Sequence, residues 1–319
     1  LEEKEQINFQ LFLQFKAYSQ YLNLKKYANE QGIKLMGDIP IYLSYDSSDV
    51  WMRPELFMLD ENNIPVYVAG VPPDNYAVDG QLWGNPLYNW PKHEEEDFMW
   101  WINRIKRQLE LFDSIRIDHF IGFANYYKIP AKDETAVNGV WEKAPGSKLF
   151  KKVKEELGEL NIIAEDLGVV NDDVRKLLKD TNFPGMKLLQ FGFSNDPNNE
   201  FLPHNYPEKS VAYTGTHDNF TTKEWFESLD EKSLNQCINY INSKSEEDRV
   251  YSLSKETLKS QSYLAIIPMQ DYLELGSEGR MNVPATVGNN WKWRLTNSYN
   301  NVDLINKIKE LTILYGRKK

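Results

Sequence analysis

The 319-residue sequence predicts an α/β fold, specifically a (β/α)8 barrel of the TIM type with an inserted subdomain. Two observations predict it. Short apolar runs alternate with helical patterns along the chain, which indicates a parallel sheet with helical crossovers. Each apolar run also ends in a cluster of polar residues. In such barrels the loops at the C-terminal ends of the strands carry the functional groups.

The first predicted element is a helix, in which apolar residues recur at steps of three and four from Leu11 to Leu22. Gly32 is its expected C-terminal stop. Further helices are predicted within residues 97–112, 172–181 and 228–243.

Six apolar runs are predicted to be strands, and a barrel of six such strands would leave unpaired edges. We therefore expect about two N-terminal strands to be missing, so that residues 1–319 form the C-terminal part of a catalytic barrel. The alternative is a genuine open sheet of six strands. The runs lie within residues 33–43, 113–120, 160–168, 185–193, 211–219 and 263–273.

Residues 44–110 separate the first and second predicted strands and are rich in Trp, Tyr, Pro and Asn. This stretch is too long for an ordinary connection in a barrel. Long segments at the functional face usually form lids or substrate subsites, so we predict an inserted substrate-binding subdomain here.

Composition narrows the possible partners. The net charge of −10 disfavours nucleic acid and anionic membranes, because there is no excess of Lys and Arg to replace phosphate counterions. Cys237 is the only cysteine, which suits a reducing cytoplasm. No apolar run approaches the roughly 20 residues of a membrane span. Aromatic residues make up 13%, which suits either a Trp-rich core or a site for sugars, whose apolar faces stack on rings.

Arg116 and Asp118 interrupt the apolar run FDSIRIDHFIGF. Residues two apart leave the same face of a strand. A guanidinium beside a carboxylate favours its charged form, as a nucleophilic carboxylate requires. The pair is therefore either a catalytic nucleophile with its partner or a structural ion pair, and the two residues alone do not decide between these readings.

Glu165 follows the apolar run LNIIA. Burial raises the pKa of a carboxyl group, and a general acid needs a raised pKa. Two carboxylates in unlike environments are the minimum for retaining glycoside chemistry. An acid after an apolar strand is common, so Glu165 alone is a weak signal.

His217 and Asp218 end the run VAYTGTHD and are candidates for binding the hydroxyl groups of a sugar. A metal site formed with Asp38 is an alternative, but no HxxxH or CxxC spacing supports it. The sequence also lacks a GxSxG elbow, a Walker loop and a GxGxxG loop. We therefore predict neither a metal nor another cofactor.

Several separated motifs, taken together, resemble the amylomaltases, which are 4-alpha-glucanotransferases or disproportionating enzymes of glycoside hydrolase family 77. The motifs occur in the same order as in that family and span almost the whole chain. They are GDIPIYLSYDSSDVW (37–51), VAGVPPDNYAVDGQLWGNPLYNW (68–90), SIRIDHFIGF (114–123), IIAEDLGV (162–169), TGTHDN (214–219) and PMQDYLELGSEGRMNVPATVGNNWKWR (268–294).

The resemblance implies a transferase that moves segments of α-1,4-glucans by a retaining mechanism. It implies Asp118 as nucleophile, Glu165 as acid/base and Asp218 as transition-state stabiliser. By the same resemblance, Arg116 contacts the nucleophile, and five further residues bind or support the substrate: Asp38, Asp74, Gln81, Trp83 and Asn282. With His217, predicted above from its place beside Asp218, and Arg116, they form the expected substrate-binding set. The substrates would be maltooligosaccharides, glucans derived from starch or glycogen, and glucose, while the sequence leaves the oligomeric state open.

Two features depart from the family pattern. Ala285 stands where the family usually has Gly, and the chain lacks the Ser-Pro-Tyr motif that follows the family's first strand. The aromatic residues Tyr76, Trp83, Tyr88 and Trp90 are predicted to line an acceptor site and exclude water. The alternatives are an α-glucan hydrolase of the same clan and a glucan-binding protein or fragment without activity.

Overall fold

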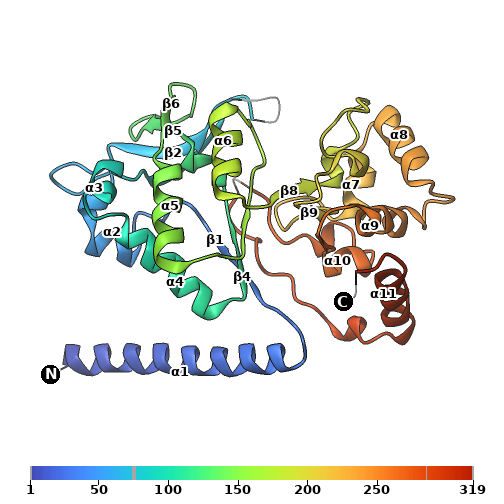
Figure 1. Cartoon of the computed structure of the whole chain (residues 1–319), viewed down its shortest axis with the longest axis horizontal. Helices are drawn as coiled ribbons and strands as arrows, with labels where there is room; N and C mark the ends of the chain where they lie inside the picture. Colours follow the sequence, from blue (N-terminus) through green and yellow to red (C-terminus); the bar gives the residue numbers. More distant parts are fainter. Residues whose placement is uncertain (1, 74–76, 285, 318–319) are drawn as a thin grey trace. The chain divides into compact units, whose positions relative to one another are not determined.

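The computed structural model describes residues 2–73, 77–284 and 286–317. It contains two compact units, Leu1–Phe183 and Pro184–Lys319, which are described separately below (Figure 1). None of the helices in the described part of the chain has the length and apolar character needed to cross a lipid bilayer.

The first unit contains a parallel sheet of three strands in the order β1-β4-β7. Apart from Met36 at the start of β1, which is 38% exposed, its apolar residues are almost fully buried; Ile115 and Ile117, for example, have no exposed surface. In its register Asp38 lies opposite Arg116, and Ile117 lies opposite Ala164. The strands are β1 (Met36–Ile39), β4 (Ser114–Ile117) and β7 (Ile162–Ala164).

Three helices cover this sheet (Figure 1) and bury Trp101, Leu149 and Val174 in one core. The last of them begins at a cap, because the Asn171 side chain accepts a hydrogen bond from the Val174 N–H at 3.0 Å. The helices are α4 (Met99–Leu111), α5 (Gly146–Leu157) and α6 (Asp172–Thr181).

A second sheet of the first unit is antiparallel, with the order β3-β2-β5-β6. Its strands are β2 (Tyr67–Val71), β3 (Gln81–Pro86), β5 (Asn125–Pro130) and β6 (Val140–Lys143). Strands β2 and β3 come from the stretch 44–110, whereas β5 and β6 lie outside it. The prediction that 44–110 is a subdomain of its own stays a prediction. Short helical turns complete this part: α2 (Ser48–Met52), η1 (Pro54–Leu56), α3 (Trp90–Glu95) and η2 (Phe120–Phe123).

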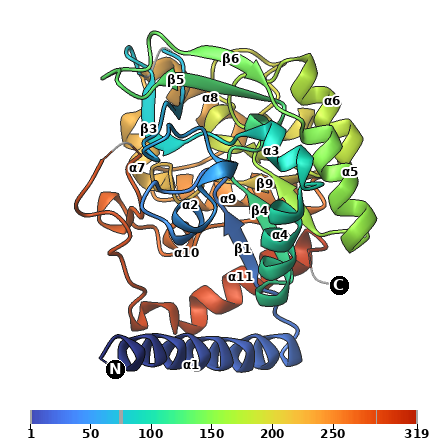
Figure 2. The same cartoon turned by 90° about the vertical axis from the view of Figure 1, so that its left-hand side faces the viewer.

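The long helix α1 (Glu2–Glu30) confirms the first predicted element (Figure 2). It stops before Gly32, whose φ of +77° suits glycine. Its C-terminal half is attached to the unit, because the Lys25 ammonium group donates to the carbonyl oxygens of Glu110 and Phe112, each at 3.1 Å. Its N-terminal half instead exposes large apolar side chains, including Phe9, Phe12 and Phe15.

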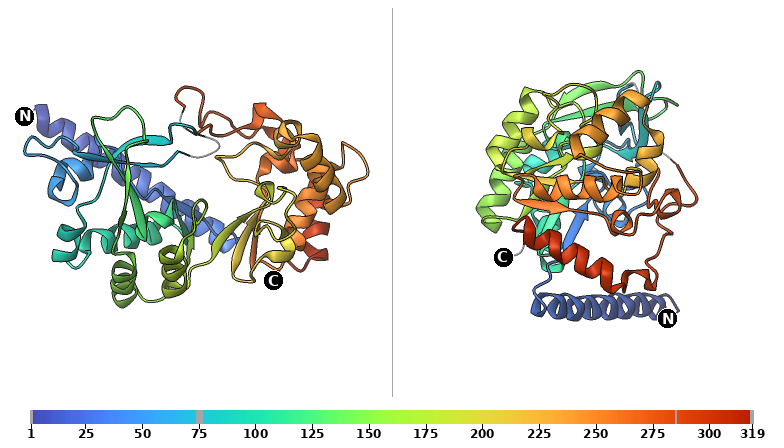
Figure 3. Two further views of the ribbon diagram at one scale, coloured as in Figure 1. Left: turned by 90° about the horizontal axis from the view of Figure 1, so that it is seen from above. Right: turned by 90° about the vertical axis from the view of Figure 1, so that its right-hand side faces the viewer.

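The second unit contains another parallel sheet, in the order β10-β9-β8. Helices seen in Figure 3 pack around it and bury Trp225, Cys237 and Leu253. The strands are β8 (Gly185–Leu188), β9 (Ser210–Tyr213) and β10 (Leu264–Ile266). The helices are α7 (Thr222–Ser228), α8 (Glu231–Ile241), α9 (Arg249–Lys259), α10 (Met269–Tyr272) and α11 (Val302–Leu314), with shorter turns η3 (Leu189–Phe191), η4 (Pro203–Asn205), η5 (Ser277–Gly279) and η6 (Asn297–Tyr299).

The structure confirms all six predicted strands and the predicted α/β class. Within the described residues the six strands form two separate three-stranded sheets, not a closed barrel. The closed eight-stranded barrel, with about two strands beyond this chain, stays a prediction.

Gly37 in β1 provides a test of the packing beside the sheet. A Cβ atom at this position would overlap the ring of Phe112, so Gly37→Ala should lower the free energy of unfolding by about 1–3 kcal/mol. Phe112→Leu should relieve the overlap, so the cost of Gly37→Ala should shrink in that background. Urea denaturation of the four proteins measures both effects. An equal cost in both backgrounds would show that the ring does not cause it.

Candidate active site

Two carboxylates follow neighbouring strands of the first unit. Asp118 comes directly after β4 and Glu165 directly after β7. The hydrogen bonds between adjacent strands continue up to these two residues. The Asp118 N–H donates to the Ile39 carbonyl at 2.9 Å, and the Glu165 N–H donates to the Ile117 carbonyl at 3.0 Å. Adjacent strands lie about 4.8 Å apart. The register therefore brings Asp118 and Glu165 to one edge of the sheet as neighbours.

Arg116 joins two of the predicted site residues. Its guanidinium donates to Asp38 Oδ2 at 2.6 Å and to Asp118 Oδ1 at 2.8 Å, and its own side chain is only 8% exposed. A buried guanidinium is costly unless carboxylates accept its hydrogen bonds. The predicted contact between Arg116 and Asp118 is confirmed, and Asp38 on the adjacent strand completes the bridge.

Glu165 lies in a different environment. It is 7% exposed, and burial together with the nearby charge of Asp118 raises its pKa to about 7. The Arg116 guanidinium and two backbone N–H groups act in the opposite direction. Those groups belong to His119, at 2.6 Å from Oε2, and to Leu167, at 2.8 Å from Oε1. The two neighbouring carboxylates thus have the unlike environments that acid/base chemistry requires.

His119 had no assigned role in the sequence analysis, yet its backbone orients Glu165. Its φ of +47° places it in the left-handed region, an uncommon conformation for a residue with a side chain. This turn directs its N–H toward the Glu165 carboxylate. Its ring is buried, which lowers its pKa to about 4, so it is neutral near pH 7. No pattern in the sequence marks a single left-handed histidine.

Of the aromatic residues predicted to line an acceptor site, Trp83 packs against His119, whose backbone N–H binds Glu165. Its indole stands edge-on to the His119 ring, with centroids 4.9 Å apart, and its N–H donates to Gln81 Oε1 at 3.1 Å. The prediction for Tyr88 and Trp90 is wrong, because they are only 1% and 6% exposed and belong to the core. Asp74, Tyr76 and Ala285 lie outside the described residues.

In the second unit, the loop after β9 carries the other predicted residues. Asp218 Oδ2 lies 3.2 Å from His217 Nε2, and Asp218 Oδ1 accepts a hydrogen bond from the Asn282 side-chain amide at 2.6 Å. The Asn282 backbone N–H also donates to the His217 carbonyl at 3.1 Å. Asn282 was predicted to bind substrate. In the structure it holds the side chain of Asp218 and the backbone of His217, and a contact with substrate stays a prediction.

A hollow of about 230 Å³ lies beside this loop within the second unit. His217 and Trp291 form part of its lining, with their ring centroids 5.1 Å apart. Trp291, in the closing motif, was not predicted as a site residue. Its pairing with a polar histidine gives this hollow the mixed apolar and polar wall that is typical of small-molecule sites.

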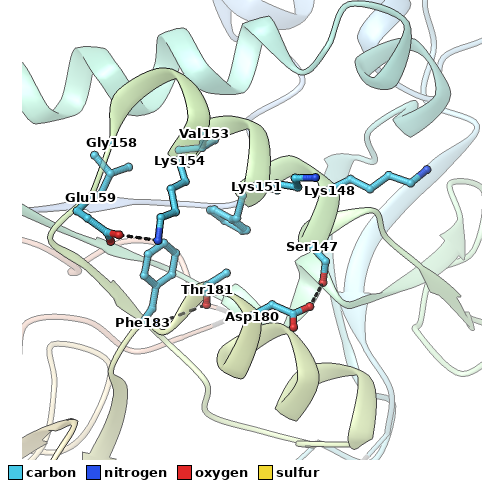
Figure 4. A pocket seen from close by; sticks show the side chains of 12 residues that line it. Ser147, Lys148, Lys151, Val153, Lys154, Gly158, Glu159, Asp180, Thr181 and Phe183 are labelled. Atoms are coloured by element: carbon cyan, nitrogen blue, oxygen red, sulfur yellow. Dashed lines mark hydrogen bonds and ion pairs between the residues drawn. The ribbon is translucent and has the colours of Figure 1, made fainter.

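Another hollow, of about 470 Å³, lies between α5 and α6 of the first unit (Figure 4). Phe150 and Phe183 form part of its wall, and the ion pair of Lys154 with Glu159 crosses one side. None of the predicted site residues lines it. Across the described residues, no three His, Cys, Asp or Glu side chains gather in a way that could hold a metal ion.

A family model described as 4-alpha-glucanotransferase, glycoside hydrolase family 77, matches residues 1–300. This chain belongs to the 4-alpha-glucanotransferase family. A 4-alpha-glucanotransferase of Clostridium butyricum is 46% identical over 318 residues, which are 99% of this chain and 65% of that protein. One of Thermus thermophilus is 47% identical over 298 residues, covering 91% of this chain and 60% of that protein. The chain thus spans less than two thirds of the length of these family members.

Solved structures agree with the family assignment. An amylomaltase from Streptococcus agalactiae in complex with acarbose has a TM-score of 0.92 at 44% identity, over 95% of this chain and 61% of that one. An amylomaltase from Corynebacterium glutamicum, at 20% identity, has a TM-score of 0.74 over 95% of this chain and 48% of that one, which shows the shared fold alone. The predicted resemblance is therefore confirmed, and the chain has an α/β fold similar to that of 4-alpha-glucanotransferases.

The structure thus brings the predicted residues together in two groups. Asp118, Glu165, Arg116 and Asp38 form one group in the first unit, with Trp83 and Gln81 near it, and His217, Asp218 and Asn282 form the other in the second unit. That the two groups share one substrate, and the role of each residue, stay predictions.

The charge of Asp118 offers a test of the first group. Because this negative charge contributes to the raised pKa of Glu165, Asp118→Asn should lower that pKa from its value of about 7. A ¹³C-NMR titration of carboxyl-labelled glutamate measures it. Asp97→Asn is the control, since its side chain is 75% exposed and pairs with Lys152. A Glu165 midpoint that does not change in Asp118→Asn would mean that the two carboxylates do not interact.

Proposed function

We propose that the full-length protein is a retaining 4-alpha-glucanotransferase. Membership of the family supports this function, and one observation carries it to specific residues: two neighbouring strands present one carboxylate paired with a guanidinium and one buried carboxyl with a pKa of about 7. Retaining glycoside chemistry needs such a pair, with carboxyl groups about 5 Å apart.

In the proposed first step, the Asp118 carboxylate attacks the anomeric carbon of an α-1,4-glucan. As that bond forms, the glycosidic C–O bond breaks, and the Glu165 proton goes to the departing oxygen. A pKa of about 7 keeps a large fraction of Glu165 protonated at neutral pH, as a general acid requires. The guanidinium of Arg116 holds Asp118 in place through a contact of 2.8 Å to Oδ1.

In the proposed second step, the ionised Glu165 takes the proton of an acceptor's 4-hydroxyl. The oxygen of that hydroxyl attacks the anomeric carbon and the bond to Asp118 breaks, which restores both carboxyl groups to their starting states. Asp218 is proposed to stabilise the positive charge that develops on the sugar in both steps. Its contacts with His217 and Asn282 support this role because they fix the carboxylate before the charge develops.

The remaining predicted residues are proposed to bind the glucan. His217 lies beside the proposed stabiliser Asp218, and Asp38 shares Arg116 with the proposed nucleophile. The indole of Trp83, which is 36% exposed and whose N–H is held by Gln81, is suited to stack on a sugar ring. Asp74 is proposed for the same role on its motif alone. Donors and acceptors would be maltooligosaccharides, glucans from starch or glycogen, and glucose. These steps require no metal and no other cofactor.

We further propose that the complete fold is a (β/α)8 barrel, of which this chain forms the C-terminal part and residues 44–110 a substrate-binding insertion. Two findings support a larger domain. Family members extend well beyond the matched portion, and Phe9, Phe12 and Phe15 expose apolar surface that further structure would cover. Activity is therefore to be tested on the full-length protein. The cytoplasmic location predicted from the cysteine content stays a prediction.

Incubation of the full-length protein with maltotriose tests the proposed function. We expect glucose together with maltooligosaccharides longer than maltotriose, because the glycosyl group passes to another sugar. Asp118→Asn should reduce turnover by several orders of magnitude and leave glucan binding intact. The control Asp97→Asn should keep both its turnover and its glucan binding. Chromatography of the products measures the outcome. Glucose and maltose without longer products would indicate a hydrolase, and binding without turnover would indicate a glucan-binding protein.

A further inference from the structure

Asp271 is a buried carboxylate that the steps proposed above do not use. It lies on the short helix α10 and is 3% exposed. Its donors are two hydroxyl groups and one backbone N–H: Thr214 Oγ1 at 2.5 Å and Thr222 Oγ1 at 2.7 Å from Oδ2, and the Thr222 N–H at 2.8 Å from Oδ1. A carboxylate in such a place is costly, and burial raises its pKa. An apolar side chain would fill the same space at lower cost.

The two threonines lie at the two ends of one loop. Thr214 directly follows β9, and Thr222 is the first residue of α7. Both side chains are fully buried. Between them lies the loop that carries His217 and Asp218, so the single carboxylate of Asp271 binds the point where this loop leaves the sheet and the point where it enters the helix.

Contacts inside the loop transmit this restraint to Asp218. Asn219 Oδ1 accepts hydrogen bonds from the Thr216 N–H at 2.9 Å and from the Thr216 hydroxyl at 2.8 Å, and the Asp218 N–H lies 3.3 Å from Thr216 Oγ1. Gln190 adds a further bond, since its side-chain amide donates to the Phe220 carbonyl at 3.1 Å. The loop is therefore a compact turn, and fixing its two ends restrains the backbone that carries the Asp218 carboxylate.

We propose that Asp271 is a positioning residue, which holds both ends of the loop 214–222 and thereby places Asp218 for transition-state stabilisation. This inference rests on the proposed function, because Asp218 has that task only if the protein transfers glucans. Asp271 acts in this proposal through Thr214 and Thr222, which have no other role in the proposed steps.

Activity measurements on the full-length protein test the positioning role. Asp271→Ala should lower kcat by about 100-fold, the scale expected when a catalytic group is misplaced by about 1 Å, with little change in KM. Asp271→Asn should recover much of this loss, because its amide oxygen can accept from the Thr222 N–H while its NH2 group donates to the hydroxyls. In an Asp218→Asn background the effect of Asp271→Ala should nearly vanish, since residues that act as one unit are strongly non-additive.

Smaller changes separate this role from general stability. Thr214→Val and Thr222→Val each remove one hydroxyl and keep the shape of the side chain, and they replace Asp271→Ala if that variant fails to fold. Thr257→Val is the matched control, because Thr257 is also fully buried but its hydroxyl bonds within α9, to the Leu253 carbonyl. We expect kcat to fall in the first two variants and not in the control. Losses that are equal in all three, or additive with Asp218→Asn, would overturn the positioning role.

Hydrogen exchange on the same proteins gives a readout that does not depend on activity. In Asp271→Ala or Thr222→Val, the amides of 214–222 should exchange at least about tenfold faster, while those of α8 should keep their rates. If the wild-type protein transfers no glucan, the proposed function fails, and this measurement still decides whether Asp271 fixes the loop. Unchanged exchange in the loop, or faster exchange throughout the second unit, would overturn the inference.

Discussion

The proposed chemistry of this protein depends on the two ion pairs that the Arg116 guanidinium makes with carboxylates. This guanidinium is buried at the end of a central strand, where an unpaired charge would be strongly destabilising. Two carboxylates accept its hydrogen bonds: Asp38, directly opposite on the adjacent strand, at 2.6 Å, and Asp118, two residues further along its own chain, at 2.8 Å. The same contacts that make the buried cation tolerable also fix the position of Asp118, so one arrangement serves both the fold and the proposed nucleophile.

Three carboxylates of the chain lie in different environments, and their proposed roles follow from these differences. Asp118 is paired with a buried cation, while its own side chain is 40% exposed. Glu165 has two backbone N–H groups and lies near the charge of Asp118, so burial and repulsion raise its pKa to about 7. Asp271 has only neutral donors from the two ends of a loop. A nucleophile, an acid/base and a positioning residue need these three environments respectively.

The sequence predicted much of this arrangement because its strongest patterns are local. Apolar runs that end in polar residues predicted all six strands and placed Asp118 and Glu165 at the ends of two of them. Features that depend on tertiary structure were not predictable in this way. The burial of Tyr88 and Trp90 arises from packing against α4 and its neighbours, and the left-handed backbone of His119 has no sequence signal. The donors to Asp271 are eight residues apart along the chain and meet only because β9 and α7 adjoin the same carboxylate.

The central claim is that Asp118 forms a covalent bond to the sugar. A fluorinated glucosyl donor, which forms the glycosyl-enzyme but releases it slowly, traps this species on the full-length protein. Peptide mass spectrometry then locates the added sugar. We expect it on the peptide that contains Asp118, in a quantity approaching one per molecule, with no label in Asp118→Asn. A stable label on another residue, or turnover of glucan without any covalent species, would contradict the account.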